Sequence, residues 1–227
     1  ETHDLYGGQF DPLDGDIDPA QLTQALAKGA RDIGAKIIRF CTVTAVKWLG
    51  DEWKITTPNG EIRAEYVVNA AGYRAGELGK MFGRDVPCVS LAHQYLITEP
   101  IAELTARDEK LPLIRDPDSS YYLRQEKDGL LLGPYEKNCR AHWLSSDDPM
   151  PDDFSFQLYN DDLERLEWYI EDACARVPIL GTAGITRVVN GPIPYTPDGL
   201  PLIGPMPSVP NAFEACVFTF GIVQAGG

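Results

Sequence analysis

The sequence predicts an α/β domain that is interrupted by an antiparallel sheet with helical cover. Three observations support this. Residues 17–82 alternate between helical and strand-like patterns. Residues 86–180 contain alternating strands, an Asp-Gly turn and an amphipathic helix. The last part returns to short apolar runs separated by turns that are rich in proline and glycine. The 227 residues allow one large domain or two small ones.

Composition excludes several classes of protein. Hydrophobic residues make up 44% of the chain, which is enough for a sizeable core. The net charge of −14 argues against nucleic acid or an anionic membrane surface as a partner. The five cysteines are scattered and include no Cys-x-x-Cys pair, so we expect no metal site and no disulfide framework, and a reducing compartment is the simpler location. No apolar run approaches the ~20 residues of a membrane span.

The first α/β segment begins with a helix. Asp18 is a suitable N-cap, Pro19 suits the first helical position, and Gly34 suits the residue that follows the helix. A short strand is predicted over residues 36–40, and residues 42–48 alternate as a second strand does.

A hairpin and a buried strand follow. Residues 53–57 and 62–66 flank a Pro-Asn-Gly turn. The apolar strand after them ends in Ala70-Ala71-Gly72, where small residues would let a ligand approach the carboxyl end of a strand. A tight turn into a helix over residues 74–82 explains the same residues equally well.

The inserted segment contains three strands and a helix. Residues 93–98 alternate, and residues 119–126 and 130–135 form a second hairpin across an Asp-Gly turn. Residues 160–177 show an apolar stripe at helical spacing, and Pro178 lies just past its end.

The stretch from Asn190 to Gly204 is rich in proline and glycine, which disfavours a helix or a central strand. Thr196-Pro197-Asp198-Gly199 is a turn signal. A strand-like run of small residues, Phe220 to Gly227, ends the sequence. The two stretches are interpreted either as one wall of a cofactor site or as a surface loop and a strand, and the local pattern alone favours the loop.

Four side chains are candidates for a substrate pocket. His93 and Tyr95 share one face of their strand, and Tyr122 and Arg124 share one face of another. If these strands are neighbours, an imidazole, phenols and a guanidinium converge. The alternative is that they are structural residues, which is the commoner role of a histidine or a tyrosine pair on a strand.

Several strings resemble known flavoproteins. Asp14-Gly15-Asp16-Ile17-Asp18-Pro19 and Val67-Val68-Asn69-Ala70-Ala71-Gly72 resemble blocks of the D-amino-acid-oxidase-like superfamily of FAD-dependent oxidoreductases. More narrowly, four later strings resemble the dimethylglycine and sarcosine dehydrogenases: His93-Gln94-Tyr95, Ser120 to Glu126, Gly133-Pro134-Tyr135-Glu136 and Val188 to Pro192.

The resemblance implies a domain division. Residues 1–80 and 186–227 would be parts of a Rossmann-like FAD/NAD(P)-binding domain, and residues 81–185 an inserted antiparallel-sheet substrate domain. The Gly-x-Gly-x-x-Gly turn that holds the phosphates of FAD in this family would lie before residue 1.

The resemblance also implies site residues. His93 and Tyr122 match the paired active-site residues of the family, while Arg124 and Tyr95 are added as substrate-binding candidates because they share faces with them. The cofactor-binding candidates are Val46, Ala70, Ala71, Gly72, Pro197, Asp198, Gly221, Ile222, Val223 and Gln224.

The implied activity is that of an FAD-dependent amine dehydrogenase or oxidase. It would oxidise the C–N bond of a small N-methylated amino acid, of the dimethylglycine or sarcosine type, with hydride transfer to flavin N5. The electron acceptor would be O₂ or an electron-transfer flavoprotein, and the location the bacterial cytoplasm or the mitochondrial matrix. Two alternatives stay open: an oxidase of another amine or a hydroxy acid, and a non-catalytic flavoprotein regulatory subunit.

Overall fold

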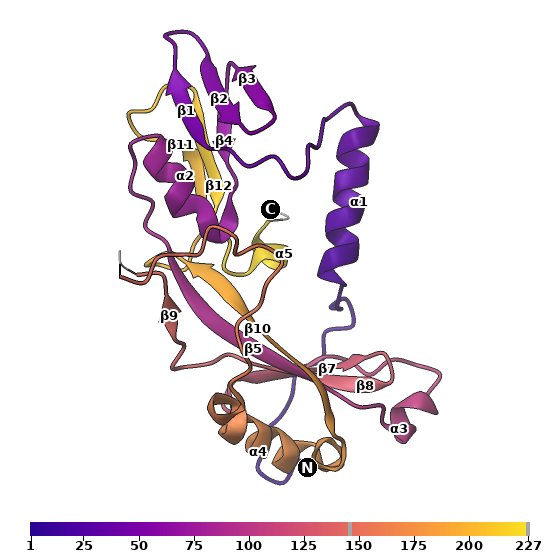
Figure 1. The fold of residues 1–227 in the computed structure, drawn as a ribbon. Helices are drawn as coiled ribbons and strands as arrows, with labels where there is room; N and C mark the ends of the chain where they lie inside the picture. Colours follow the sequence, from indigo (N-terminus) through magenta and orange to yellow (C-terminus); the bar gives the residue numbers. More distant parts are fainter. Residues whose placement is uncertain (145–146, 226–227) are drawn as a thin grey trace. The chain divides into compact units, whose positions relative to one another are not determined.

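The computed structural model describes residues 1–144 and 147–225, and its fold is mixed α/β, as predicted (Figure 1). The chain divides into two compact units. The α/β unit consists of Ile17–Ser90 and Ile193–Gly227, and the sheet unit consists of Glu1–Asp16 and Leu91–Pro192. The functional boundaries predicted at residues 80 and 185 stay a prediction. None of the helices in the described ranges is long and apolar enough to cross a bilayer.

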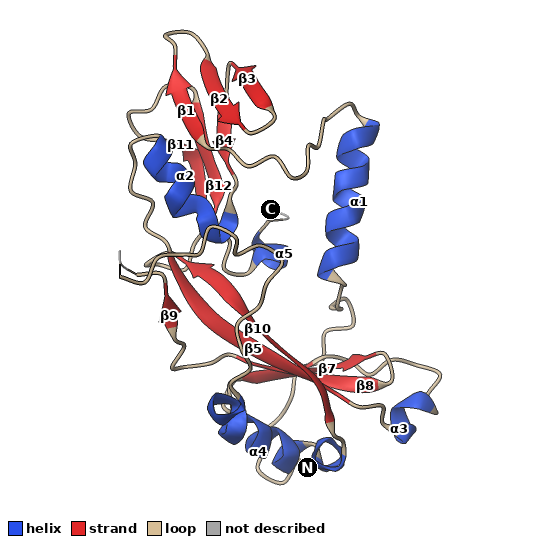
Figure 2. Ribbon diagram, in the orientation of Figure 1, coloured by secondary structure: helices blue, strands red, loops and turns tan. Residues whose placement is uncertain are grey.

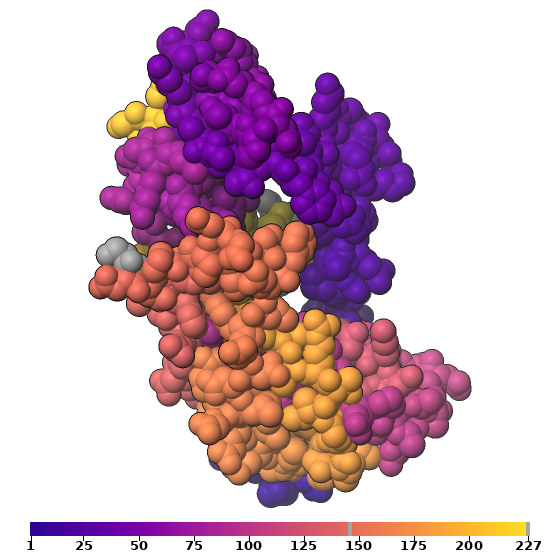
Figure 3. All heavy atoms as spheres, viewed as in Figure 1, coloured from indigo at the N-terminus to yellow at the C-terminus, as the bar shows by residue number. Residues whose placement is uncertain are grey.

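The α/β unit begins with helix α1, Pro19–Asp32. The Asp18 carboxylate accepts hydrogen bonds from the first turn, and Gly34 follows the helix with φ +99°, so both predicted helix ends are confirmed. No residue of α1 is buried, and Figure 3 shows the helix (indigo) at the surface. The predicted strand over residues 36–40 is wrong, because no strand of the described residues pairs with it.

A small antiparallel sheet follows α1. Its strands are β1 (Ala45–Trp48), β2 (Trp53–Thr57) and β3 (Gly60–Ala64), in that order. Thr57 pairs with Gly60, which confirms the hairpin predicted here. The Trp53 ring is buried and its Nε1–H donates to the carbonyl of Pro210, 2.9 Å away, so this sheet is fastened to the last part of the unit.

A second sheet of the α/β unit has the order β11-β12-β4. Its strands are β11 (Leu202–Pro205), β12 (Ala212–Cys216) and β4 (Val67–Asn69). The 3-10 turn η1 (Gly72–Arg74) and helix α2 (Ala75–Met81) follow β4. β12 and β4 are parallel, so their carboxyl ends lie together and the segments that follow the two strands begin at the same end of the sheet.

The strand-like run at the end of the sequence is instead helix α5, Gly221–Gln224. The amide of Gln224 donates to the carbonyl of Phe220 (2.9 Å), so these small residues close a helical turn rather than extend. Gly226 and Gly227 lie outside the described residues.

The sheet unit is built on a sheet with the order β10-β5-β8-β7-β6, and β9 also pairs with β5. The hairpin of β7 with β8 confirms the prediction. The loop favoured for the stretch from Asn190 to Gly204 is corrected in its first part, because β10 runs to Tyr195 through Pro192 and Pro194. The stretch does avoid a central strand, since β10 lies at the edge of the sheet. An edge strand tolerates proline, since one side of it needs no hydrogen-bond donors. The bounds are β5 (Val89–Thr98), β6 (Ile114–Asp116), β7 (Tyr121–Glu126), β8 (Gly129–Pro134), β9 (Ala141–His142) and β10 (Ile185–Tyr195).

Helices cover one face of this sheet (Figure 2). The predicted helix over residues 160–177 is shorter and divided, and consists of the 3-10 turn η2 (Leu163–Leu166) and α4 (Glu167–Arg176). Leu96, Leu123 and Leu132 of the sheet are buried in one core cluster with Leu166 and Ala173. The opposite face of the strands is therefore the one that is available for a site. Short helices α3 (Ala102–Thr105) and η3 (Pro178–Thr182) complete the unit.

Candidate functional site

The face opposite the core carries polar side chains on β6 and β7, and a glycine of β8 lies beside them. Tyr122 of β7 is paired with Gly133 of β8 on one side and with Arg115 of β6 on the other. Directly paired residues of antiparallel strands point to the same side of a sheet, so these three residues share a face. Arg124 lies two residues from Tyr122 and therefore shares it too.

The same face continues onto β5. Ile97 pairs with Leu131, which pairs with Arg124. Tyr95 and His93 lie two and four residues from Ile97, and strand alternation directs them to this side. The four predicted residues thus share a face, although β8 lies between β5 and β7 and the two strands that carry them are not neighbours.

Gly133 is the residue that lets Tyr122 lie across β8. A Cβ atom at Gly133 would overlap the Tyr122 ring. The ring also contacts Tyr135, with centroids 5.6 Å apart. Burial, and then the neighbouring Tyr135, raise the pKa of the Tyr122 phenol, so it stays protonated near neutral pH and can donate a hydrogen bond. Sequence reasoning missed Gly133, although a glycine inside a strand is a known sign of close approach.

His93 is largely buried, with 13% of its side chain exposed. Its Nε2 lies 3.1 Å from the Sγ of Cys139, and its Nδ1 lies 4.0 Å from Oε1 of Glu136. Burial, and then the charge of Arg165, lower the pKa of His93 to about 4.

The Glu136 carboxylate would favour a charged imidazole, but two facts oppose this. Burial raises the pKa of Glu136 itself, and its Oε2 is paired with Nη2 of Arg165 at 3.3 Å. Desolvation therefore decides, and His93 is a neutral base at pH 7.

Arg124 is already engaged by carboxylates. Its Nη1 lies 3.0 Å from Asp16 and its Nη2 lies 2.8 Å from Glu126. The Lys110 ammonium also donates a hydrogen bond to the Asp16 carboxylate. This bond lowers the pKa of the Asp16 carboxyl more than the contact with Arg124 does. Arg115 is exposed, and no carboxylate of the described residues is paired with it. Two cations thus border the Tyr122 face, and the exposed one is Arg115.

In the α/β unit, the predicted Ala70, Ala71 and Gly72 form the turn that follows β4. Asn69, which is fully buried, shapes this turn: its Nδ2 donates to the carbonyl of Ala75 (3.0 Å) and its Oδ1 accepts from the amide of Ala71 (3.2 Å). Gly72 has φ +58°, a left-handed conformation that favours glycine. Asn69 is a positioning residue that the sequence pattern did not single out.

The predicted Pro197 and Asp198 lie in a tight turn. The Asp198 carboxylate accepts from the amide of Leu200 (3.1 Å) and from the Thr196 hydroxyl (3.0 Å), and these bonds, in that order, lower its pKa. Nε2 of Gln224 donates to the carbonyl of Gly199 (3.5 Å), so α5 contacts this turn.

Helix α5 itself presents backbone donors. It carries the other predicted residues, Gly221, Ile222 and Val223, all of which are exposed. The amides of a first helical turn have no partner within the helix, so they can bind an acceptor.

Val46 is set apart from the other cofactor candidates. It lies on β1, where it pairs with Ile55, and it packs against the core cluster of Trp53, Met206 and Ala212. Packing accounts for its side chain, and its contact with a cofactor stays a prediction.

Comparisons with known proteins agree with this arrangement. Residues 1–227 match the family described as FAD dependent oxidoreductase (DAO). Mitochondrial dimethylglycine dehydrogenase of Mus musculus is 45% identical over 228 aligned positions, which cover 98% of this chain and 26% of that protein. Mitochondrial sarcosine dehydrogenase of Homo sapiens is 37% identical, over 99% of this chain and 24% of that protein.

Two further relatives differ in kind. The mitochondrial pyruvate dehydrogenase phosphatase regulatory subunit of Mus musculus is 30% identical over 100% of this chain and 25% of that protein. The crystal structure of L-proline dehydrogenase from P. horikoshii superposes with a TM-score of 0.77, at 26% identity, over 95% of this chain and 54% of that one.

The match to the family extends over the whole chain, while the chain spans about a quarter of the length of these curated relatives. The chain therefore belongs to the family of FAD dependent oxidoreductases.

Proposed function

We propose that the full-length protein is an FAD-dependent enzyme that oxidises the C–N bond of a small N-methylated amino acid. The observation that carries this proposal is the polar face of the sheet unit, where a neutral, buried His93 and a protonated Tyr122 are accompanied by cations. Similarity to dimethylglycine and sarcosine dehydrogenases supports the substrate class.

The residues of the α/β unit fit FAD. The turns that contain Gly72 and Gly199 have positive φ and open space where a Cβ would lie, so a planar ligand can approach their backbone. The exposed amides of Gly221, Ile222 and Val223 suit the acceptor atoms of a flavin. When bound, FAD would supply the redox chemistry by accepting hydride at N5.

The residues of the sheet unit would prepare the substrate. An N-methylated amino acid is an ammonium ion near neutral pH, and the lone pair that assists loss of hydride must first be freed. His93, which is neutral at pH 7, is the base that would accept this proton. The Tyr122 hydroxyl would hold the amine in place as a hydrogen-bond partner.

A cation of this face would hold the substrate carboxylate, and we propose Arg124 for this role, with Tyr95 of the same face as a further substrate-binding residue. Because Arg124 is neutralised by Asp16 and Glu126, Arg115 is the competing choice. In the full-length protein, the matched variants Arg124→Met and Arg115→Met separate them. Loss of a charge-assisted hydrogen bond costs about 1.5–3 kcal/mol, so the variant that removes the true partner raises KM by roughly tenfold or more. Steady-state kinetics measures this, and a KM unchanged from that of the unsubstituted protein in both variants would contradict both assignments.

The test of the function is a panel of amines with the purified full-length protein. Dimethylglycine and sarcosine should bleach the oxidised flavin absorbance in the absence of oxygen, and a hydroxy acid of similar size should not. No bleaching with any amine favours the alternative, a non-catalytic regulatory subunit, which similarity to the phosphatase regulatory subunit supports. If only amines other than dimethylglycine and sarcosine bleach the flavin, the result would favour the other alternative, an oxidase of a different amine.

The same preparation identifies the electron acceptor. Reoxidation by O₂ alone indicates an oxidase, whereas a requirement for an electron-transfer flavoprotein indicates a dehydrogenase. We propose the mitochondrial matrix, or the cytoplasm of a bacterium, as the location, in keeping with the mitochondrial relatives.

A further inference from the structure

Cys139 occupies a defined place between the backbone and the imidazole of His93. Its Sγ lies 2.9 Å from the carbonyl oxygen of Glu136 and 3.1 Å from Nε2 of His93. The other ring nitrogen is farther from the sulfur, at 3.9 Å. A half-buried cysteine in this position is more than a small hydrophobic residue, because both of its polar contacts are directional.

The proton of the thiol decides the direction of both bonds. Burial, and then the charge of Glu136, raise the pKa of Cys139 to about 11, so it is a thiol near neutral pH. A thiol has one proton, and the carbonyl of Glu136 can only accept it. The sulfur is then left to accept a hydrogen bond from Nε2–H of His93.

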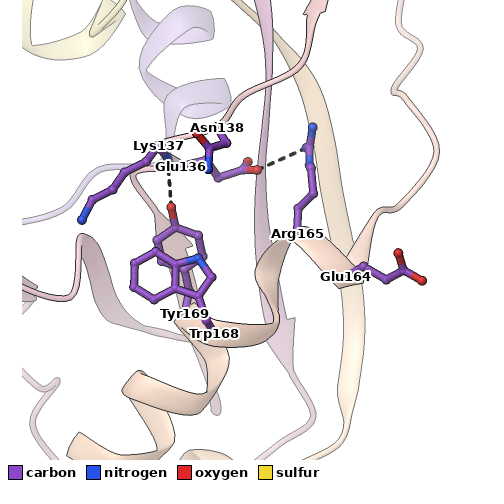
Figure 4. A pocket seen from close by; sticks show the side chains of 7 residues that line it. All are labelled: Glu136, Lys137, Asn138, Glu164, Arg165, Trp168 and Tyr169. Carbon is purple, nitrogen blue, oxygen red and sulfur yellow. Dashed lines mark hydrogen bonds and ion pairs between the residues drawn. The ribbon is translucent and has the colours of Figure 1, made fainter.

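The carbonyl that takes the thiol proton is held firmly. The amide of the next residue, Lys137, donates to the hydroxyl of Tyr169 (2.9 Å), and the Glu136 side chain is paired with Arg165 (Figure 4). The Glu136 carboxylate also accepts from the amide of Gln94 (2.7 Å). Lys137, Glu136 and Arg165 also border a hollow of about 350 Å³.

We propose that Cys139 is a positioning residue for His93. Its thiol donates to the Glu136 carbonyl and accepts Nε2–H, which holds the ring in the tautomer with its proton on Nε2 and its lone pair on Nδ1. This inference rests on the proposed function, in which neutral His93 takes the proton of the substrate amine. The charged groups that face His93 are Glu136, from the segment after β8, and Arg165, from η2.

The test compares Cys139→Ala and Cys139→Ser in the full-length protein. Alanine removes both bonds and leaves space for water, so the pKa of His93 should rise towards its ordinary value. In a plot of the rate of anaerobic flavin reduction against pH, the fall in rate on the acidic side (the acidic limb) should then shift to higher pH by about one unit or more. Serine can make both bonds and should restore the original limb. Cys174→Ala, in α4 of the same unit, is the matched control and should leave the limb in place.

A second readout does not depend on catalysis. With ¹³C,¹⁵N-labelled histidine, and the His93 signal assigned by its loss in His93→Gln, the ¹⁵N shifts should show a protonated Nε2 in the unsubstituted and serine proteins. The alanine protein should show a mixture of tautomers. An unchanged pH limb together with unchanged shifts in Cys139→Ala overturns the inference, as does a serine variant that behaves like alanine. If His93→Ala does not slow flavin reduction, the proposed function fails, while the shifts still decide the role of Cys139.

Discussion

Replacing His93 by alanine in the full-length protein is expected to slow anaerobic flavin reduction by roughly tenfold or more, because the base that takes the amine proton is lost. The pH dependence should identify the same group. With a pKa of about 4, His93 is neutral throughout the neutral range, so the unsubstituted protein should lose rate through this group only at clearly acidic pH. The alanine variant should lack that acidic limb. Stopped-flow absorbance of the flavin over a range of pH measures both effects.

His142→Ala is the matched control, because His142 lies in the same unit and its ring stacks on Tyr159. It should keep the rate and the acidic limb. An unchanged rate in His93→Ala would remove His93 from the mechanism. The stability of the fold offers a further check: a histidine whose pKa is lowered on folding stabilises the protein above its ordinary pKa of 6.5, and this contribution is lost as the pH falls towards about 4. Thermal unfolding of His93→Ala should lack this part of the acid dependence.

Gly133→Ala should impair the enzyme about as much as loss of the Tyr122 ring itself. The added methyl group would overlap the ring, so Tyr122 must leave its place over β8. A hydrogen-bond partner displaced by even one ångström costs on the order of a hundredfold in rate. We therefore expect a large fall in the rate of flavin reduction, with secondary structure retained by circular dichroism.

The double variant makes this prediction specific. Once the ring is absent in Tyr122→Ala, adding Gly133→Ala should cost nothing further, since the two changes remove the same feature. Gly181→Ala is the control, because a Cβ there would meet only Cys174, at an ordinary 3.5 Å. Additive losses in the double variant would show that Gly133 acts through something other than Tyr122.

Local features of the chain were correctly predicted where local chemistry is sufficient. Asp18 and Gly34 fix the ends of α1 because capping depends on the residues within one turn. The β7–β8 hairpin depends on its short turn, and strand alternation correctly assigned His93, Tyr95 and Tyr122 to particular faces.

Pairing between distant segments is where sequence reasoning failed or was silent. The strand expected over residues 36–40 has the right residues but no partner in the described chain, and the run at Gly221 forms a helical turn instead of a strand. In contrast, β10 accepts Pro192 and Pro194 only because it lies at the edge of its sheet.

By itself the sequence determined the family, the ends of α1, the two hairpins and the residue types of the candidate site. The tertiary structure alone decided that β8 separates β5 from β7, that Gly133 makes room for Tyr122, and that Cys139 lies against His93. The physical reason is that these contacts join residues 11 to 46 positions apart, and their geometry depends on strand order and register rather than on local propensity.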